Sequence, residues 1–289
     1  MNAKEFGLAV LVTAIWGINF SFIKLGLSAI DPYLLAAMRF FFCAVPAIFF
    51  VKRPPIAWRY LVGYGISFGV LQWGMVYAAL QFGLSAGLAS VITQTAVFFT
   101  MLFGVLFFKE KLNAPHVVGT LIAFCGVALI FFYTDGSTTV LGLSLGLGGA
   151  MGWALANVVV KKSEATDMFG FMIWSSVVAP LPLLALSLAF SGSEGIRASI
   201  THFDLIALAS LLFQVYPTTL LGYSIWNHLL SKYSVSTVAP LALLVPVFGM
   251  LGSVIIFKEG LPAYKIAAIG LIFSGLLVHR FGGRFLVRA

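Results

Sequence analysis

Two stretches of the sequence decide the fold: residues 91–112, VITQTAVFFTMLFGVLFFKEKL, and residues 240–261, PLALLVPVFGMLGSVIIFKEGL. They align when the chain is shifted by 149 residues, and both end in the pattern Phe-Lys-Glu-x-Leu. Apolar composition alone produces scattered matches, but not a shared charged motif at the end of an apolar run. The chain therefore carries an internal repeat, whose identical pairs in this window are Phe99/Phe248, Met101/Met250, Leu102/Leu251, Val105/Val254, Phe108/Phe257, Lys109/Lys258, Glu110/Glu259 and Leu112/Leu261.

The composition around these stretches is that of a membrane protein. Hydrophobic residues make up 61% of the 289 positions and charged residues only 9%, whereas a soluble domain carries roughly 25% charged residues. The net charge of +8 is spread over short gaps between apolar runs, so no nucleic-acid-binding face is expected. Both cysteines, Cys43 and Cys125, lie inside apolar segments, which predicts neither a disulfide nor a metal site, and no cofactor is expected.

The apolar runs are long enough to cross a bilayer as helices, which takes about 20 residues each. Only short connectors remain between them, so membrane lipid is expected to surround most of the chain. We predict an all-α membrane protein with ten transmembrane helices, at residues 7–29, 32–51, 60–81, 85–108, 115–133, 138–160, 168–190, 204–229, 234–257 and 263–281.

The orientation follows from the lysines and arginines in the short loops, which collect on the cytoplasmic side. With the N-terminus inside, the outer side receives only Arg197, Lys258 and Lys265. This asymmetry predicts a multi-pass inner-membrane protein with both termini in the cytoplasm. The cytoplasmic side then receives Lys4, Lys52, Arg53, Arg59, Lys109, Lys111, Lys161, Lys162, Lys232, Arg280, Arg284 and Arg288.

Each repeat holds five predicted spans, an odd number, so the two halves must cross the bilayer in opposite directions. This explains why Lys109 falls on the cytoplasmic side and its counterpart Lys258 on the other side. Inverted repeats are typical of transporters whose substrate site lies between the halves near the midplane. We predict two inverted five-helix units, residues 1–136 and 137–289.

Five segments carry a resemblance to a known family: WGINFSFIKLG (16–26), LAAMRFF (35–41), AGLASVITQTAVFFTMLFGVLFFKEKL (86–112), GTLIAFCGVALI (119–130) and VAPLALLVPVFGMLGSVIIFKEGL (238–261). They resemble the EamA family of the drug/metabolite transporter superfamily, and the likeness covers nearly the whole chain. Within that family, the resemblance is greatest to the bacterial exporters of O-acetylserine and cysteine. It implies a non-enzymatic exporter of small amino-acid-like metabolites that works by alternating access through a cavity lined mainly by the third, fourth, eighth and ninth spans.

Charged groups inside a span are costly and therefore indicate function or pairing. Arg39 lies seven residues after Pro32, about 10 Å below the outer end of its helix at 1.5 Å per residue. No Asp or Glu is expected at comparable depth, so the partner of Arg39 is a backbone carbonyl, water or the carboxylate of the cargo. Lys24 lies at similar depth on the first span, where it either contacts cargo or extends toward the interface.

Amides and aromatic rings supply the other candidate cargo contacts. Asn19 follows Trp16 by three residues, and Asn157 follows Trp153 by four in the corresponding span of the second half. For each buried amide the alternative role is a hydrogen bond between helices. The remaining candidates are Gln72 and Gln94 in the third and fourth spans, and Tyr223 and Asn227 in the eighth.

Two other functions remain open at this stage. Residues 65–69, Gly-Ile-Ser-Phe-Gly, match the G-x-S-x-G motif of serine hydrolases, but that motif needs a strand-to-helix elbow and here lies inside a predicted helix. A translocator of lipids or other hydrophobic metabolites with the same fold is the second alternative. Ion-driven transporters usually place a carboxylate in the bilayer, and none is expected here, which favours facilitated efflux or exchange.

Overall fold

The computed structural model is helical, and the residues that it describes, 1–109, 114–133, 138–233 and 238–286, contain no strand. Seven helical stretches are long and apolar enough to cross a membrane. Shorter apolar helices, Ala114–Ile130, Leu241–Phe257 and Ala263–Val278, lie at three further predicted spans. The chain is therefore a helical, multi-pass membrane protein, as the sequence predicts. The arrangement of ten spans in two inverted units stays a prediction.

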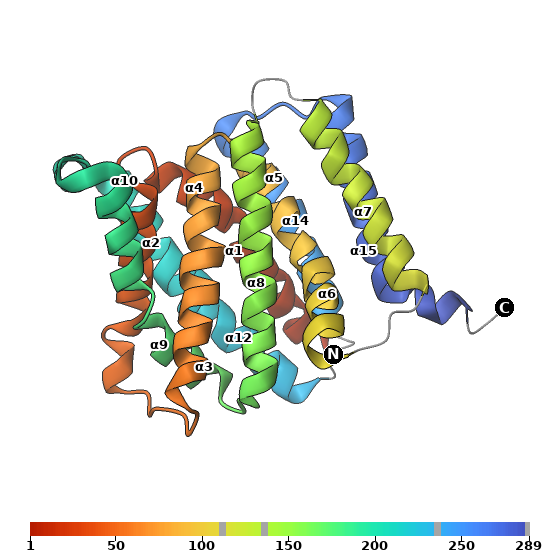
Figure 1. Cartoon of the computed structure of the whole chain (residues 1–289), viewed down its shortest axis with the longest axis horizontal. Coiled ribbons are helices and arrows are strands. Elements are labelled where there is room, and N and C mark those ends of the chain that lie inside the picture. The colour runs from red at the N-terminus through yellow and green to blue at the C-terminus, as the bar shows by residue number, and fades with distance from the viewer. Residues whose placement is uncertain (110–113, 134–137, 234–237, 287–289) are drawn as a thin grey trace.

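Most predicted spans consist of more than one helical element (Figure 1). The elements are α1 (Ala3–Gly26), α2 (Pro32–Ala44), η1 (Ala47–Phe49), α3 (Trp58–Tyr64), η2 (Gly65–Gly74), α4 (Met75–Gln81), α5 (Ala86–Ile92), η3 (Thr93–Thr95), α6 (Ala96–Phe108), α7 (Ala114–Phe132), α8 (Val140–Ser163), α9 (Met168–Ser176), α10 (Pro180–Thr201), α11 (Leu205–Phe213), η4 (Gln214–Leu221), α12 (Gly222–Lys232), η5 (Ala239–Leu244), α14 (Val245–Phe257) and α15 (Ala263–Leu286).

The repeated Phe-Lys-Glu motif ends a helix in both halves. Lys109 follows α6 with φ of 54°, and Lys258 follows α14 with φ of 53°. A residue in this left-handed conformation is a common C-terminal cap because it turns the chain out of the helix. The sequence repeat therefore corresponds to a repeated local structure.

Departures from α-helical geometry also recur at the repeat spacing. The elements η2 and η4 are π-helical, and Gly65 at the start of η2 lies 149 residues before Gln214 at the start of η4. The elements η3 and η5 are 3₁₀-helical and overlap at the same spacing. Such segments often occur at functional sites because they widen or tighten a helix and redirect its side chains.

The first helix of each half packs into the other half. Helix α1 contacts α14, α11 and α12, and α8 contacts α6, η2 and α4. The approach of α1 to α14 depends on Gly17, because a Cβ atom there would lie 2.4 Å from the Val245 carbonyl oxygen and 2.7 Å from the Gly249 nitrogen. Helices α7 and α15 pack along each other, beside the remaining helices (Figure 1).

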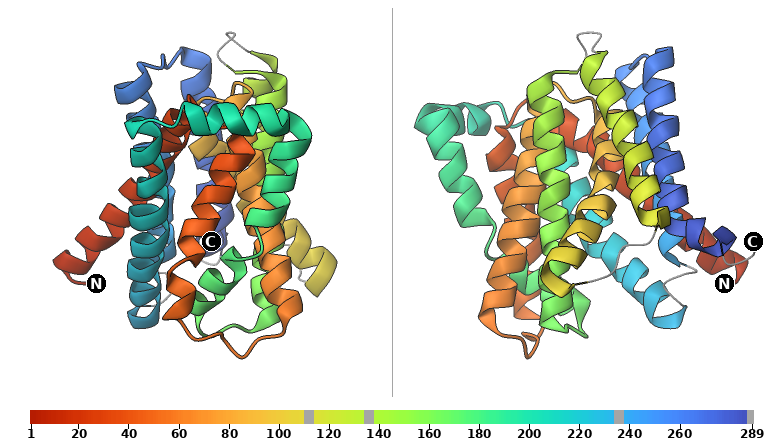
Figure 2. Two further views of the ribbon diagram at one scale, coloured as in Figure 1. Left: turned by 90° about the vertical axis from the view of Figure 1, so that its left-hand side faces the viewer. Right: turned by 45° about the vertical axis from the view of Figure 1, so that its right-hand side comes forward.

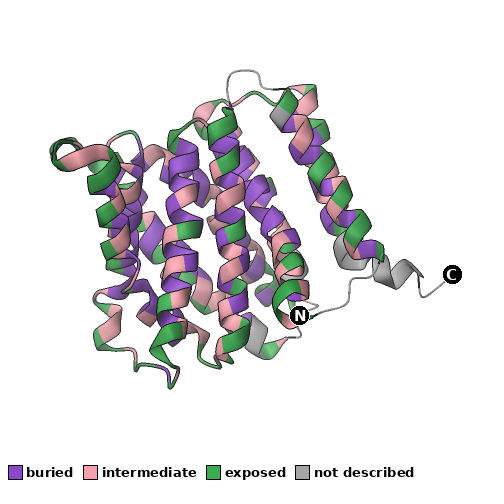
Figure 3. Ribbon diagram, in the orientation of Figure 1, coloured by how far each residue is buried: buried purple, intermediate pink, exposed green. Residues whose placement is uncertain are grey.

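The outer surface of the bundle is apolar. Buried and exposed positions lie on different sides of most helices (Figure 3), and the exposed positions include Leu181, Leu205 and Ile255. In a membrane protein such side chains face lipid. Figure 2 shows that α1 begins and α15 ends toward the same end of the molecule, and that the last part of α10, beyond a bend at Gly192, crosses the opposite end.

Candidate functional site

A cavity of about 360 Å³ lies between helices of the two halves. Its lining includes residues of the π-helical elements η2 and η4 and of the 3₁₀ elements η3 and η5. It extends to Val160 in the last turn of α8 and to Met168, the first residue of α9. Eight of the ten candidate cargo contacts line it: Trp16, Asn19, Arg39, Gln72, Gln94, Trp153, Asn157 and Tyr223.

Arg39 is the charged residue of this lining. Its side chain is 1% exposed, and its guanidinium carbon lies 4.1 Å from the centre of the Trp73 ring. Nη1 donates to the Tyr77 hydroxyl at 3.3 Å and Nη2 to the Thr219 hydroxyl at 3.2 Å, whereas Nε has no hydrogen-bond partner. The partners of this buried cation within the protein are thus neutral.

A chain of hydrogen bonds supports Arg39 from behind. The Tyr77 hydroxyl donates to the side-chain oxygen of Gln214, whose amide nitrogen donates to Ser210 at 2.8 Å. The Thr219 hydroxyl donates to the Gln214 carbonyl at 2.7 Å, a contact across the π-helical turn. Tyr77, Gln214 and Thr219 were not among the sequence-based candidates. Gln214 carries the same signal as Gln72, a polar residue in an apolar span, whereas the hydroxyl residues carry none.

Four buried polar atoms of the lining residues lack hydrogen-bond partners in the protein. Three are donors, Asn19 Nδ2, Arg39 Nε and Trp73 Nε1, and one is an acceptor, Gln72 Oε1. Asn19 lies close to Arg39 along the helix axis, because the two residues contact neighbouring threonines. The Asn19 oxygen accepts from the Thr218 hydroxyl at 3.0 Å, and Arg39 donates to the Thr219 hydroxyl. Buried polar groups are normally paired, and an unpaired one costs about 1–3 kcal/mol.

Aromatic rings line much of the rest of the cavity. The Trp16 ring lies 5.2 Å from Tyr223 and 5.1 Å from Trp226. Its indole nitrogen donates to the Thr218 carbonyl at 2.9 Å. Gly222 allows this approach, because a Cβ atom there would lie 2.6 Å from the same nitrogen.

Two of the predicted amides that line the cavity also join helices. Gln94 donates from η3 to the Ala242 carbonyl of η5 at 3.2 Å. Asn157 donates from α8 to the Thr100 hydroxyl of α6 at 3.0 Å. Both residues therefore make the interhelical hydrogen bond that was the alternative prediction, and both also line the cavity.

Lys24 is not part of the cavity lining. Its ammonium lies 2.9 Å from Glu259 and 4.7 Å above the Phe257 ring. Glu259 lies two residues beyond the end of α14 at Phe257, so it is an acidic residue at a helix end, as the sequence predicts. The expectation that no carboxylate lies at the depth of Arg39 stays a prediction. Burial opposes ionisation of Glu259, but the Ser253 hydroxyl, Lys24 and the Ser85 hydroxyl outweigh it and hold the pKa of this carboxyl below its ordinary value.

Asn227 and Ser67 are the two remaining residues that the sequence analysis singled out. The side chain of Asn227 lies outside the described part of the structure. Ser67, the serine of the G-x-S-x-G match, donates to the Gly63 carbonyl at 2.7 Å within a π-helical segment, not at a strand-to-helix elbow. Within the described ranges, no group of three or more His, Cys, Asp or Glu side chains could hold a metal ion.

The chain is similar to transporters along nearly its whole length. A model of the EamA-like transporter family matches residues 4–132 and 140–280. Proteins described as a probable amino-acid metabolite efflux pump share 38% identity in Salmonella typhimurium (98% of this chain, 97% of the relative) and 36% in Escherichia coli K12 (99% and 97%). An uncharacterized transporter of Archaeoglobus fulgidus shares 25% identity (95% and 98%).

A solved structure supports the fold alone. It carries only the description "Crystal structure of protein" and superimposes with a TM-score of 0.60 at 19% identity, covering 93% of this chain and 94% of its own. The family match over both halves and the relatives that align from end to end show that the chain belongs to the EamA-like transporter family.

Proposed function

We propose that this transporter exports small amino-acid-like metabolites, of the cysteine and O-acetylserine kind, across the bacterial inner membrane by alternating access. Both termini are then cytoplasmic, in accordance with the distribution of lysine and arginine, and the cavity faces the cytoplasm through the end lined by Val160 and Met168. The names of the relatives that share 36–38% identity support the cargo class.

The observation that carries the proposal is the unneutralised charge of Arg39. A cation buried without an anion pays a desolvation penalty that neutral hydrogen bonds offset only in part. A cargo carboxylate would supply the missing anion and would accept from Arg39 Nε, and the unpaired donors of Asn19 and Trp73 would be available at the same level. The unpaired oxygen of Gln72 would accept from an ammonium group beside that carboxylate.

The residues that line the cavity also bear on whether transport is coupled to an ion gradient. Its lining among the described residues contains no Asp or Glu, and a carboxylate is the usual carrier of a coupled proton or sodium ion. Facilitated efflux or exchange of amino acids therefore fits this lining better than ion coupling. A lipid translocator is the second candidate, because most of the lining is aromatic or aliphatic.

Counterflow into proteoliposomes tests the proposal. Vesicles preloaded with unlabelled cysteine, O-acetylserine or leucine should take up the labelled compound, and the methyl esters of these amino acids should compete poorly. Arg39→Gln should weaken the apparent affinity at least thirtyfold, because breaking a buried charge pair costs about 2 kcal/mol or more. Arg39→Lys should retain part of it.

The matched control is Arg59→Gln, which removes an exposed arginine whose contact is the Tyr60 hydroxyl. It should transport as the wild type does. Equal affinities of wild type and Arg39→Gln, or equal competition by acids and esters, would disprove the role of the carboxylate. Movement of a labelled phospholipid without movement of any amino acid would favour the lipid translocator.

A further inference from the structure

Another cavity, of about 640 Å³, lies at the end of the molecule opposite the start of α1. Its lining comes from the connection between α1 and α2, the end of α4, the start of α8 and the last part of α10, so both halves contribute. Among the described residues, none lines both this cavity and the one around Arg39. We call this cavity the outer cavity, and the one around Arg39 the central cavity.

The last part of α10, residues 193–201, crosses this end of the molecule as a short strap (Figure 2). Gly195 and Ser199 lie one helical turn apart on the strap, and both line the outer cavity. Glu194 and Arg197 are exposed instead. The strap therefore has one face on the outer cavity and one charged face toward water.

A single residue, Asp31, ties the strap to the bundle on both sides of its bend. The Ser191 hydroxyl donates to one oxygen of the Asp31 carboxylate, and the Asp31 backbone N–H donates to the Ser199 hydroxyl at 3.0 Å. The other carboxylate oxygen caps α2, because it accepts from the backbone N–H groups of Tyr33 and Leu34 at 3.1 and 2.9 Å. The strap is thus fastened to the start of the helix that carries Arg39.

The strap joins the rest of α10 through a bend that favours glycine. Gly192 has φ of 68° and ψ of −179°, a conformation that residues with a side chain rarely adopt. A Cβ atom at Gly192 would meet nothing within 4 Å, so glycine is needed here for its backbone freedom and not for space. One conformationally free residue therefore separates the strap from the first part of α10.

The outer cavity follows the central cavity along two stretches of helix. On α2, Tyr33 lines the outer cavity and Arg39 the central one, about 9 Å apart along the axis at 1.5 Å per residue. Trp73 of η2 lines the central cavity and Gln81 of α4 the outer one. Tyr77, which lies between them in the sequence, is fully buried and bonds to Arg39. Cargo that moves from Arg39 toward this end therefore passes Tyr77 and enters the outer cavity.

We infer that the strap is a latch on the outer exit, which must leave Asp31 by rotation at Gly192 before cargo can leave through the outer cavity. This inference rests on the proposed function, in which this end faces away from the cytoplasm, and it adds a moving part to that function. The carboxylate makes the bond to Ser191 a charge-assisted one, which holds the latch closed in the absence of cargo. Detachment leaves the cap of α2 intact, because the cap uses the other carboxylate oxygen.

A reversible disulfide across the latch tests whether the strap moves. Asp31→Cys and Ser191→Cys are combined with Cys125→Ser, which removes the exposed native thiol, while the buried Cys43 stays. Oxidation of this variant should slow counterflow of labelled O-acetylserine roughly tenfold or more, because a locked latch blocks a required conformational step. A reducing agent should restore the rate. Either cysteine alone, in the same background, should transport equally under both conditions.

The outcomes separate the latch from the proposed function. Full counterflow by the oxidised variant, or failure of the disulfide to form, would overturn the latch and leave the proposed function standing. Failure of the wild type and of the reduced variant to exchange any amino acid would instead overturn the proposed function.

Labelling of a residue beneath the strap tests the latch without a disulfide. Ile30 lines the outer cavity and is 3% exposed, so a cysteine there should react slowly with a water-soluble thiol reagent. In the same background, Ser191→Ala or Gly192→Ala should speed labelling of Ile30→Cys roughly fivefold or more, because one removes a bond to a charged group and the other strains the bend. The controls are Ser193→Ala, an exposed serine of the strap, and Gly270→Ala, an equally open glycine within α15. Equal labelling rates in the latch variants and the controls would overturn the inference.

Discussion

Each end of the bundle has a lysine beside a phenylalanine of the repeated motif, but the surroundings of the two pairs differ. At one end, Lys24 of α1 lies 4.7 Å above the ring of Phe257 and 2.9 Å from Glu259. At the other end, Lys161 and Lys162 of α8 lie 4.3 and 5.7 Å from the ring of Phe108. Phe108 and Phe257 are identical partners in the sequence repeat. Both ends are thus built from the same kind of parts.

The packing at these ends differs. At the Lys24 end, Gly17 brings α1 against α14, and the ion pair fastens α1 to the residues that follow α14. At the Lys162 end, the cavity reaches Val160 and Met168. Alternating access would exchange the two arrangements. Glu110, the counterpart of Glu259, lies outside the described residues.

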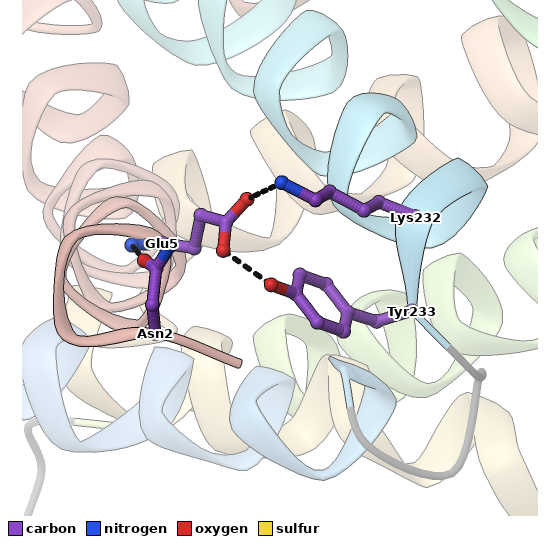
Figure 4. Close-up of polar contacts among 4 residues, drawn as sticks. All are labelled: Asn2, Glu5, Lys232 and Tyr233. Carbon is purple, nitrogen blue, oxygen red and sulfur yellow. Dashed lines mark hydrogen bonds and ion pairs between the residues drawn. The ribbon is translucent and has the colours of Figure 1, made fainter.

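A second ion pair joins α1 to the last residue of α12, and its residues are not part of the cavity lining. Glu5 accepts from Lys232 at 2.5 Å and from the Tyr233 hydroxyl (Figure 4). Helices α1 and α12 carry Trp16 and Tyr223, neighbours on one side of the cavity. The Glu5 contacts therefore hold one side together, whereas the Lys24 pair fastens the end where α1 and α14 pack closely.

The largest effect is expected from filling the close contact between α1 and α14. Gly17→Leu should lower the free energy of unfolding by about 1–3 kcal/mol or more, because its side chain would overlap the backbone of α14. The apparent melting temperature in detergent measures the loss. Gly7→Leu is the matched control on the same helix, where a Cβ atom meets nothing within 4 Å. Equal melting temperatures of the two variants would contradict the tight packing at this end.

A smaller effect is expected from reversing the charge of Lys24. Lys24→Glu places two carboxylates together and should slow counterflow roughly tenfold, equivalent to about 1.4 kcal/mol, because it removes the ion pair that fastens α1 to the residues after α14. Lys24→Glu combined with Glu259→Lys should restore most of the rate.

The matched reversal at the other end is Lys232→Glu, opposite Glu5. The Lys232 side chain is 52% exposed against 32% for Lys24, and exposed pairs contribute about 0–1 kcal/mol. Its effect should therefore be several times smaller. Equal slowing by both reversals, or no rescue by the exchange of charges, would show that the two ends do not differ in the way the ion pairs suggest.

The fold class could be predicted because it depends on local properties of the sequence. Long apolar runs and the repeated motif are visible without knowing which helices touch. The cavity could be predicted in part for a similar reason: amides and Arg39 are rare in apolar spans, so they stand out. That they line a cavity is a finding, and that they bind cargo stays a prediction.

Other features carry no such signal. Tyr77 and Thr219 are ordinary residues in an apolar helix, and their role beside Arg39 follows only from packing. The pairing of Lys24 with Glu259 joins residues 235 positions apart and depends on where α14 ends. The π-helical turns were likewise not predicted, because they arise from packing and hydrogen bonding around the cavity.

The smallest effect is expected from pH. The pKa of Glu259 lies below its ordinary value of about 4.3, so the ion pair with Lys24 is fully formed above that value and is lost only as pH falls through the lowered pKa. The ratio of counterflow rates between wild type and Lys24→Gln should therefore be constant from pH 8 to about pH 5. Purified protein in proteoliposomes, with equal pH on both sides, provides the measurement. A ratio that falls toward one between pH 7 and 5 would mean that Glu259 takes up a proton in the working range. The ion pair would then be a proton-sensitive contact rather than a permanent charge pair between α1 and the residues after α14.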